Sequence, residues 1–213
     1  MATRDRAPTA LPIATAITLL AALLRFLYLG HDSLWFDEVL TRGTAVASLA
    51  SPAAALAMRD HVPLLYWLTA LVLRVLPEHE VTLRLVSALA GVLAVPLLLA
   101  LGRAARLPAA GRWAALLLAV SPFHIRYSQE ARHYALLLFF SLLALYWLYR
   151  ATAAGACGDR RAGRIWLAFA AATVANLLTH YSAWLWLVGQ GVAVGLWLAW
   201  RARQADRSAA RTV

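Results

Sequence analysis

Residues Leu11 to Leu29 read LPIATAITLLAALLRFLYL, an apolar run of 19 residues in which Arg25 is the only charge. A helix needs about 20 such residues to cross the hydrocarbon core of a bilayer. A signal peptide would have a shorter apolar region followed by small residues at a cleavage site, whereas Phe26 to Leu29 stay large and apolar. The run therefore predicts a retained membrane helix.

The rest of the chain has the same character. Hydrophobic residues make up 62% and charged residues 14%, whereas soluble domains carry roughly 25% charged residues. This composition excludes a soluble enzyme, a disordered chain and a disulfide scaffold. The Leu and Ala content favours helices, whose backbone satisfies its own hydrogen bonds in lipid. We expect an all-α polytopic membrane helix bundle, with further apolar segments at Val62–Leu76, Leu83–Gly102, Trp113–Ile125, Tyr134–Tyr149, Ile165–Tyr181 and Ala183–Trp200.

Some chemistry is absent from the sequence. Cys157 is the only cysteine, so neither an internal disulfide nor a Cys/His zinc pattern can be built. All 20 basic residues are arginine, which removes Schiff-base lysine chemistry and any Walker-type phosphate lysine. In a membrane protein the net charge of +10 reports topology, so no nucleic-acid partner is expected.

The orientation of the segments rests on length and on the acids. Six spans and seven spans each place 13 arginines inside, so the positive-inside rule does not separate them. Val62–Leu76 would be only about 22 Å long as a helix and contains Arg74, which favours an interfacial or re-entrant helix. About six spans then place seven of the ten acids and all six histidines outside. We expect a cytoplasmic N-terminus at 1–10, a membrane domain at 11–200 with its first outer loop at 30–82, and a basic cytoplasmic tail at 201–213.

The first outer loop carries one candidate site, His31-Asp32-Ser33-Leu34-Trp35-Phe36-Asp37-Glu38. The adjacent carboxylates of Asp37 and Glu38 suit a general base with a supporting acid, or a divalent-cation site. The structural alternative is a helix start, with Asp32 or Ser33 as the cap of a helix running through Ala57.

A second candidate site lies between two apolar segments, in Ser121-Pro122-Phe123-His124-Ile125-Arg126-Tyr127-Ser128-Gln129-Glu130-Ala131-Arg132-His133-Tyr134. Ionisable groups at membrane depth are costly and usually face a cavity or a partner. Arg126 and Arg132 could bind a lipid phosphate through paired donors. The alternative is a tight turn whose arginines reach the headgroups.

Two more stretches have weaker signals. His61 precedes Pro63, a residue common at helix starts, so a structural role is strong there. His180 and Tyr181 end an apolar segment, where a headgroup contact competes with a role in substrate binding. The Trp and Tyr residues suit membrane interface belts or stacking on a sugar ring.

Together these stretches resemble the C-type, polyprenyl-phosphate-dependent membrane glycosyltransferases. The resemblance is closest to glycosyltransferase family 39, which includes the protein O-mannosyltransferases and the lipid A aminoarabinose transferase. Val62 departs from the family pattern, which often has a second proline there. The stretches that carry the resemblance are Leu34–Glu38, His61–Leu64, the Arg84–Arg103 span with Gly91 and Pro96, Ser121–Arg132 and Thr179–Tyr181.

The resemblance implies a sugar transfer from a polyprenyl-phosphate donor to a hydroxyl, with inversion, on the extracytoplasmic side. It implies that Asp37 is the catalytic base and that Glu38 is the neighbouring acid of the same motif. It also implies interfacial helices in the first outer loop. The expected substrate-binding residues are His61, Arg126, Tyr127, Gln129, Glu130, Arg132, His180 and Tyr181, and a divalent cation, if used, would bind Asp37 and Glu38.

Family members are considerably longer than this chain. We therefore expect it to correspond to their N-terminal catalytic half, with a second subunit as a candidate source of the other half. A different class of function is a noncatalytic membrane module that binds polyprenyl phosphate or serves in assembly or transport. An intramembrane protease is disfavoured, because the sequence has neither Gly-x-Ser-x-Gly nor His-Glu-x-x-His.

Overall fold

The computed structural model describes residues 10–57, 62–156 and 161–209, and every regular element in them is helical. This confirms the predicted all-α helix bundle. Within these described ranges, two helices are long and apolar enough to cross a membrane, Glu80–Ala104 and Tyr134–Ala154, and five shorter apolar helices accompany them. The number of spans stays a prediction. The helices are α1 Ala10–Phe26, α2 Phe36–Ala50, α3 Ala53–Leu56, α4 Leu64–Leu73, α5 Glu80–Ala104, α6 Pro108–Val120, α7 Pro122–Ser128, α8 Tyr134–Ala156, α9 Ala162–Leu177 and α10 Ala183–Ala209.

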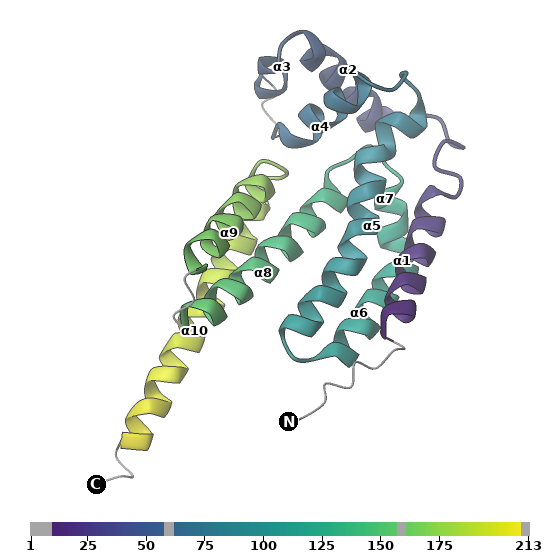
Figure 1. The fold of residues 1–213 in the computed structure, drawn as a ribbon. Helices are drawn as coiled ribbons and strands as arrows, with labels where there is room; N and C mark the ends of the chain where they lie inside the picture. Colours follow the sequence, from purple (N-terminus) through teal and green to yellow (C-terminus); the bar gives the residue numbers. More distant parts are fainter. Residues whose placement is uncertain (1–9, 58–61, 157–160, 210–213) are drawn as a thin grey trace.

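Helix α5 is the centre of the bundle and packs against α1, α4, α6, α7 and α8 (Figure 1). Small residues allow the close approach. A Cβ on Gly102 of α5 would lie 2.5 Å from the Cα of Gly111 in α6, so only glycine fits there. One core cluster joins α1, α5 and α6 and another joins α4, α5 and α8; their fully buried members are Ala21, Val95, Ala115 and Ala119, and Leu65, Ala135 and Leu136.

The apolar segment expected at Trp113–Ile125 is two helices rather than one. Helix α6 ends at Val120, and α7 begins at Pro122 after the extended residue Ser121, with φ −63° and ψ 114°. Proline lacks the N–H that a continuing helix needs and keeps the residue before it out of the helical region. The Ser121 side chain then accepts a hydrogen bond from His124 N at 3.4 Å and caps α7.

Helices α2, α3 and α4 gather at one end of the bundle, where α1 ends and α5 begins (Figure 1). We call this the site end. Helix α4 is joined there to the end of α9, because Leu64 N donates to Leu178 O at 2.9 Å. Trp67 of α4 also donates through Nε1 to Pro52 O, between α2 and α3, at 2.9 Å. The segment Val62–Leu76, which was predicted not to cross the membrane, thus contains the ten-residue helix α4 at the site end.

Two long polar side chains tie α1 to the α6–α7 region at the site end. Arg25, fully buried in the last turn of α1, donates to Leu118 O and Ala119 O at 2.9 and 3.1 Å. In return, Gln129 Nε2 donates to Leu27 O just beyond α1 at 2.7 Å. The last carbonyls of a helix lack partners within it and favour cationic or amide donors. Arg25 therefore satisfies two carbonyls at the end of α6, and Gln129 satisfies one just beyond the end of α1.

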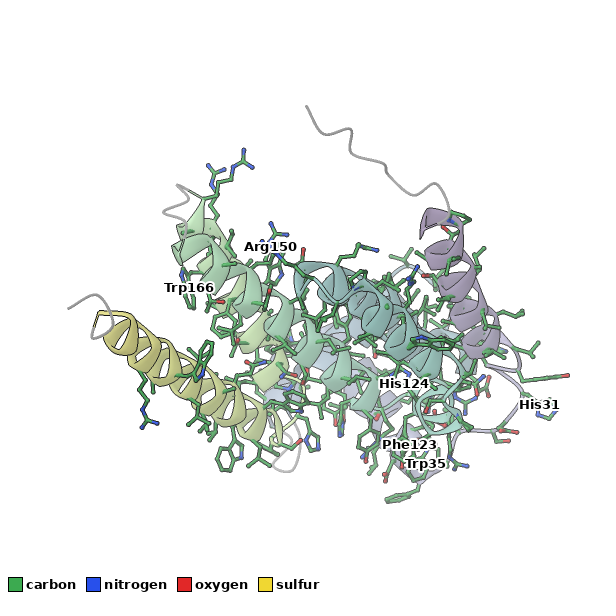
Figure 2. The ribbon with its side chains drawn as sticks, turned by 90° about the horizontal axis from the view of Figure 1, so that it is seen from below. His31, Trp35, Phe123, His124, Arg150 and Trp166 are labelled. Carbon is green, nitrogen blue, oxygen red and sulfur yellow. The ribbon has the colours of Figure 1, made fainter. Side chains whose placement is uncertain are left out.

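Helices α8, α9 and α10 form the other side of the molecule. Ser141 of α8 and Asn176 of α9 are hydrogen-bonded at 3.1 Å inside their contact. Helix α10 lies at the edge of the bundle and leans away from it toward its C-terminal end (Figure 1). In the view from below, Phe123 and His124 lie away from Arg150 and Trp166, which mark the α8–α9 side (Figure 2).

Candidate functional site

The first turn of α2 presents Asp37 and Glu38 in different directions. Trp35 is extended, with φ −87° and ψ 172°, and α2 begins with Phe36. Trp35 N donates to Glu38 Oε2 at 3.4 Å, so this end of α2 is closed by Glu38 and not by Asp32 or Ser33. The expected helix through Ala57 is interrupted at Ser51, just before Pro52. Both acids nevertheless lie in the first turn of a helix, which agrees with the structural alternative of a helix start.

Glu38 is fully buried and is saturated with hydrogen-bond donors. Its Oε1 accepts from Arg84 Nε at 2.8 Å and from Ala131 N at 2.7 Å. Its Oε2 accepts from Arg84 Nη2 at 2.7 Å, beside the Trp35 contact. A carboxylate has about four lone-pair positions, and all four are used. Glu38 therefore joins α2, α5 and the turn before α8 at one point.

Arg84, near the start of α5, is the other half of this junction. Its Nη1 donates to Leu29 O at 2.9 Å and Asp32 O at 3.0 Å, and its Nη2 to Ser33 O at 3.3 Å. One guanidinium thus holds the chain between α1 and α2 while it forms the fork with the Glu38 carboxylate. The backbone that leads to Asp37 is fixed from both sides.

Asp37 points away from this junction toward Arg132. Asp37 Oδ2 lies 3.3 Å from Arg132 Nη2, and the Asp37 side chain is 31% exposed whereas that of Arg132 is 8% exposed. Arg132 Nε is buried and has no hydrogen-bond partner among the described residues. Together with the bond from Ala131 N to Glu38, this contact shows that the Asp37 loop and the Gln129–Arg132 turn lie next to each other.

Glu130 and Arg126 form a separate pair beside this contact. Arg126 Nε lies 3.2 Å from Glu130 Oε1, and Arg126 is largely exposed. Burial raises the pKa of Glu130, and the nearby Glu38 raises it further, whereas Arg126 and Arg132 lower it. Of the two arginines predicted to bind phosphate, only Arg132 contacts Asp37.

Aromatic rings extend from this region toward the end of α9. Tyr134 lies under the Arg132 guanidinium at 5.9 Å and packs edge-on against Tyr127 at 4.7 Å. The rings of His133 and His180 are 4.4 Å apart, which brings the start of α8 next to the turn between α9 and α10. His180 thus joins the site end with Tyr127, whereas Tyr181 is half exposed beyond it. His61 lies outside the described residues.

Sequence reasoning missed Arg84 and Tyr66 as site residues. A lone arginine at the start of an apolar span signals a partner, but nothing in the sequence says that the partner is 46 residues away. Tyr66 of α4 is buried beside the Asp37–Arg132 contact. Burial raises its pKa, which the charge of Arg132 lowers and that of Asp37 raises.

A cation site at Asp37 and Glu38 was the alternative use of the two acids. In the part of the chain that the structure describes, no group of three or more His, Cys, Asp or Glu side chains is arranged to hold a metal ion. Glu38 has no lone pair left for one, because its oxygens are taken by Arg84 and by backbone N–H groups.

The site residues from Arg84 to Tyr181 fall within a stretch that matches a known family. The model of the dolichyl-phosphate-mannose-protein mannosyltransferases matches residues 60–205. The chain belongs to this family. Its membership makes it a membrane glycosyltransferase and confirms the resemblance seen in the sequence. Comparison with curated proteins and with solved structures gave no match.

The matched stretch begins after Asp37 and Glu38. In this chain Asp37 contacts Arg132 and Glu38 contacts Arg84. The family match does not cover these two acids, and their roles stay predictions. Both arginines that hold them lie inside the matched residues.

Proposed function

We propose that the chain transfers a sugar from a polyprenyl-phosphate donor to an acceptor hydroxyl, with inversion, at the Asp37–Arg132 contact. The observation that carries this proposal is the pairing of a partly exposed carboxylate with a buried guanidinium at 3.3 Å. Such a pair has one group that can take a proton and another that can hold a phosphate. The family description, which names a mannosyl phosphate lipid, supports the donor class.

In the proposed reaction the acceptor hydroxyl oxygen attacks the anomeric carbon of the donor sugar. The bond from that carbon to the phosphate oxygen breaks, and its electron pair leaves with the polyprenyl phosphate. The hydroxyl proton passes to Asp37. Arg132 stabilises the negative charge on the departing phosphate, and binding of that phosphate draws its guanidinium away from the base. One displacement at the anomeric carbon inverts its configuration.

Glu38 suits a positioning role better than proton transfer. A base needs a lone pair within reach of the substrate, and every Glu38 oxygen already accepts from Arg84, Ala131 N or Trp35 N. We propose that Glu38 sets the distance between α2, which carries Asp37, and the turn that carries Arg132.

The proposal further assigns the site to the extracytoplasmic side of a six-span bundle. Asp32, Asp37, Glu38, Glu78 and Glu130 lie at the site end. Arg103 and Arg150 lie toward the C-terminal ends of α5 and α8, and Arg106 and Arg161 lie between helices, all toward the opposite end of the bundle, as expected of a cytoplasmic face. Tyr127, Gln129, Glu130, Arg126, His180 and Tyr181 remain proposed substrate contacts around the pair.

The test is transfer from radiolabelled mannosyl-phosphoryl polyprenol to a Ser/Thr-containing peptide in proteoliposomes. Asp37→Asn keeps the side chain's size but cannot take a proton, so kcat should fall about 10²–10⁴-fold with donor binding retained. Asp32→Asn is the matched control, because Asp32 belongs to the same segment, is 90% exposed and pairs only with the neighbouring His31 among the described residues.

Near-normal turnover in Asp37→Asn protein that still binds the donor would refute the base assignment. Wild-type protein that binds the labelled donor and transfers nothing would instead identify a noncatalytic lipid-binding module.

A further inference from the structure

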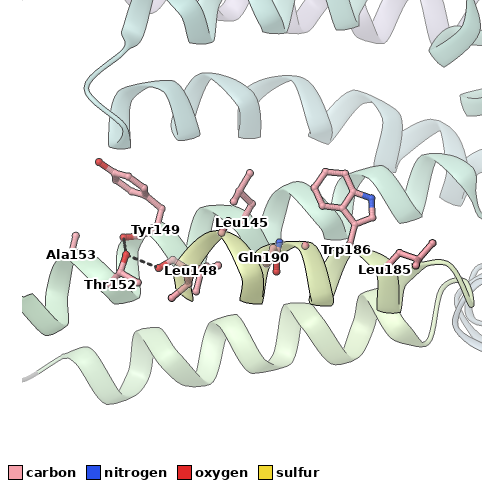
Figure 3. Close-up of a pocket in the computed structure, with 11 residues that line it drawn as sticks. Leu145, Leu148, Tyr149, Thr152, Ala153, Leu185, Trp186 and Gln190 are labelled. Atoms are coloured by element: carbon pink, nitrogen blue, oxygen red, sulfur yellow. Dashed lines mark hydrogen bonds between the residues drawn. The ribbon is translucent and has the colours of Figure 1, made fainter. Parts of the chain in front are cut away.

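Cationic side chains gather on the connection between α5 and α6, at the end of the bundle opposite the site end (Figure 1). Three exposed arginines lie there, Arg103, Arg106 and Arg112. The groove of about 660 Å³ between α8 and α10 differs in character, because the described residues that line it include no charged side chain (Figure 3). An anionic group therefore finds cations at the α5–α6 connection and none in that groove.

Two of these arginines are brought together by a crossing of glycines. Gly102 of α5 and Gly111 of α6 face each other so closely that a Cβ on Gly111 would lie 2.8 Å from the Gly102 Cα. Arg103 and Arg112 are the next residues along each helix. One residue turns a helix by about 100°, and since α5 and α6 run in opposite directions, both steps turn toward the same side of the pair. Arg103 and Arg112 therefore lie on one side of the crossing.

These positive charges are not balanced within the part of the chain that the structure describes. There, the side chains of Arg103, Arg106 and Arg112 form no ion pair and no hydrogen bond. Like charges repel, so guanidiniums held on one short connection favour an anion between them. Guanidiniums bind phosphate oxygens through paired N–H donors. The chemistry of this surface therefore suits a phosphate group.

Arg106 occupies a backbone position that usually belongs to glycine. Its φ is +61°, in the left-handed region. Arg106 N donates to Arg103 O at 3.1 Å and Leu107 N donates to Gly102 O at 2.8 Å, the two bonds of a Schellman motif that ends α5. Glycine adopts this conformation without a steric penalty, whereas arginine does not. The chain thus has a third cation beside the crossing at a position where glycine would suit the backbone better.

The neighbouring residues place this surface at the level of lipid headgroups. Helix α5 has 25 residues and is about 37 Å long at 1.5 Å per residue, whereas a hydrocarbon core is about 30 Å thick. A helix of this length that crosses the bilayer reaches the headgroups at its ends. Leu107 is 60% exposed and Trp113 is 66% exposed beside the arginines. Exposed tryptophan next to arginine is typical of a membrane interface, and a soluble anion would leave both apolar side chains uncovered.

We propose that these three arginines bind the phosphate of one anionic phospholipid in the leaflet opposite the transfer site. The exposed Leu107 and Trp113 side chains contact the start of its acyl chains. Three cations select a headgroup with a net negative charge over phosphatidylcholine, whose phosphate is already balanced by its own choline. The lipid site and the transfer site lie at opposite ends of α5, so lipid binding does not depend on the proposed reaction.

The test is lipid binding by the purified protein in detergent, with phosphatidylglycerol and phosphatidylcholine as probes and native mass spectrometry to count bound lipids during a titration. Wild-type protein should bind phosphatidylglycerol in preference, with one molecule bound first. Arg103→Gln and Arg112→Gln should each weaken phosphatidylglycerol binding roughly 5-fold, because each loses one cation that faces the phosphate. Binding of phosphatidylcholine should be unchanged.

Arg106→Gly separates lipid binding from a structural role. Glycine suits the left-handed position, so Tm in lipid-free detergent should stay the same or rise, while phosphatidylglycerol binding weakens roughly 5-fold. Arg164→Gln is the matched control for net charge. It removes an exposed arginine from the start of α9, away from the α5–α6 connection, so phosphatidylglycerol binding should be unchanged.

Equal affinity of wild-type protein for the two lipids would overturn the proposal. So would a loss of phosphatidylglycerol binding in Arg164→Gln as large as that in Arg103→Gln, or an Arg106→Gly protein that loses Tm and keeps its lipid affinity. Inorganic phosphate is the third probe. If it raised the Tm of lipid-free wild type as much as phosphatidylglycerol does, the surface would bind free phosphate and not a lipid.

Discussion

Glu38 and Glu78 each pair with an arginine, but only the Glu38 pair is buried. The same Glu→Gln substitution should therefore lower the stability of the protein much more at position 38 than at position 78. Glu38→Gln replaces one carboxylate oxygen with an NH2 group. In one orientation that group faces Arg84 Nη2 and Trp35 N, and after a flip it faces Arg84 Nε and Ala131 N. Either way, donors meet donors, and the buried Arg84 charge loses its counter-ion.

The size of the effect follows from burial. The Arg84 and Glu38 side chains are 5% and 0% exposed, and removing one member of a buried pair typically costs about 3–5 kcal/mol. For a chain of 150–250 residues each kcal/mol lowers Tm by about 2–4 °C, so Glu38→Gln should lower Tm by about 6–20 °C. The assay is thermal unfolding of the purified protein in detergent micelles.

Glu78→Gln is the matched control. Glu78 pairs with Arg42, and the two side chains are 40% and 47% exposed, so this pair contributes at most about 1 kcal/mol. Its loss should move Tm by no more than about 4 °C. If Glu38→Gln shifted Tm no more than Glu78→Gln does, the argument that the buried junction holds the site together would fail.

Three further predictions concern single positions. Gly91→Ala places a Cβ 2.1 Å from the Ser128 Oγ, so it should destabilise the protein by about 1–3 kcal/mol in the same unfolding assay, whereas Gly163→Ala, in open space, should be neutral or slightly stabilising. Because burial raises the folded-state pKa of Glu130, its contribution to stability is full below the unfolded pKa of about 4.3 and is lost as the pH rises through the folded value. Wild type should therefore lose Tm relative to Glu130→Gln between pH 4 and 8, and a constant difference would contradict this. Arg132→Gln should weaken binding of labelled donor roughly 10- to 100-fold, and unchanged affinity would argue against Arg132 as the phosphate ligand.

The two clusters that sequence analysis selected do meet in space, but their members differ in ways that the sequence does not show. Asp37 and Glu38 are adjacent carboxylates and look equivalent in the sequence. The structure leaves Asp37 partly exposed and buries Glu38 completely. Successive residues of a helix differ by about 100° around its axis, so Asp37 faces Arg132 and Glu38 faces Arg84 of α5. Which face of α2 is buried depends on how the helix packs against its neighbours, and no local sequence pattern predicts this.

The sequence by itself determined the class of the protein. Long runs of Leu and Ala with few charges cannot leave backbone groups unpaired in lipid, so they form helices whatever their neighbours do. It also marked the residues suited to proton and phosphate chemistry, because these are rare in so apolar a chain and stand out wherever they occur.

Only the tertiary structure decided which of those residues work together. Arg84 meets Glu38 across 46 positions, Ala131 N reaches the same carboxylate across 93, and Arg132 meets Asp37 from another helix start. These contacts depend on the packing of α5 against α2 and of the α7–α8 turn against both. Such packing is set by the summed fit of many apolar side chains and not by any one motif.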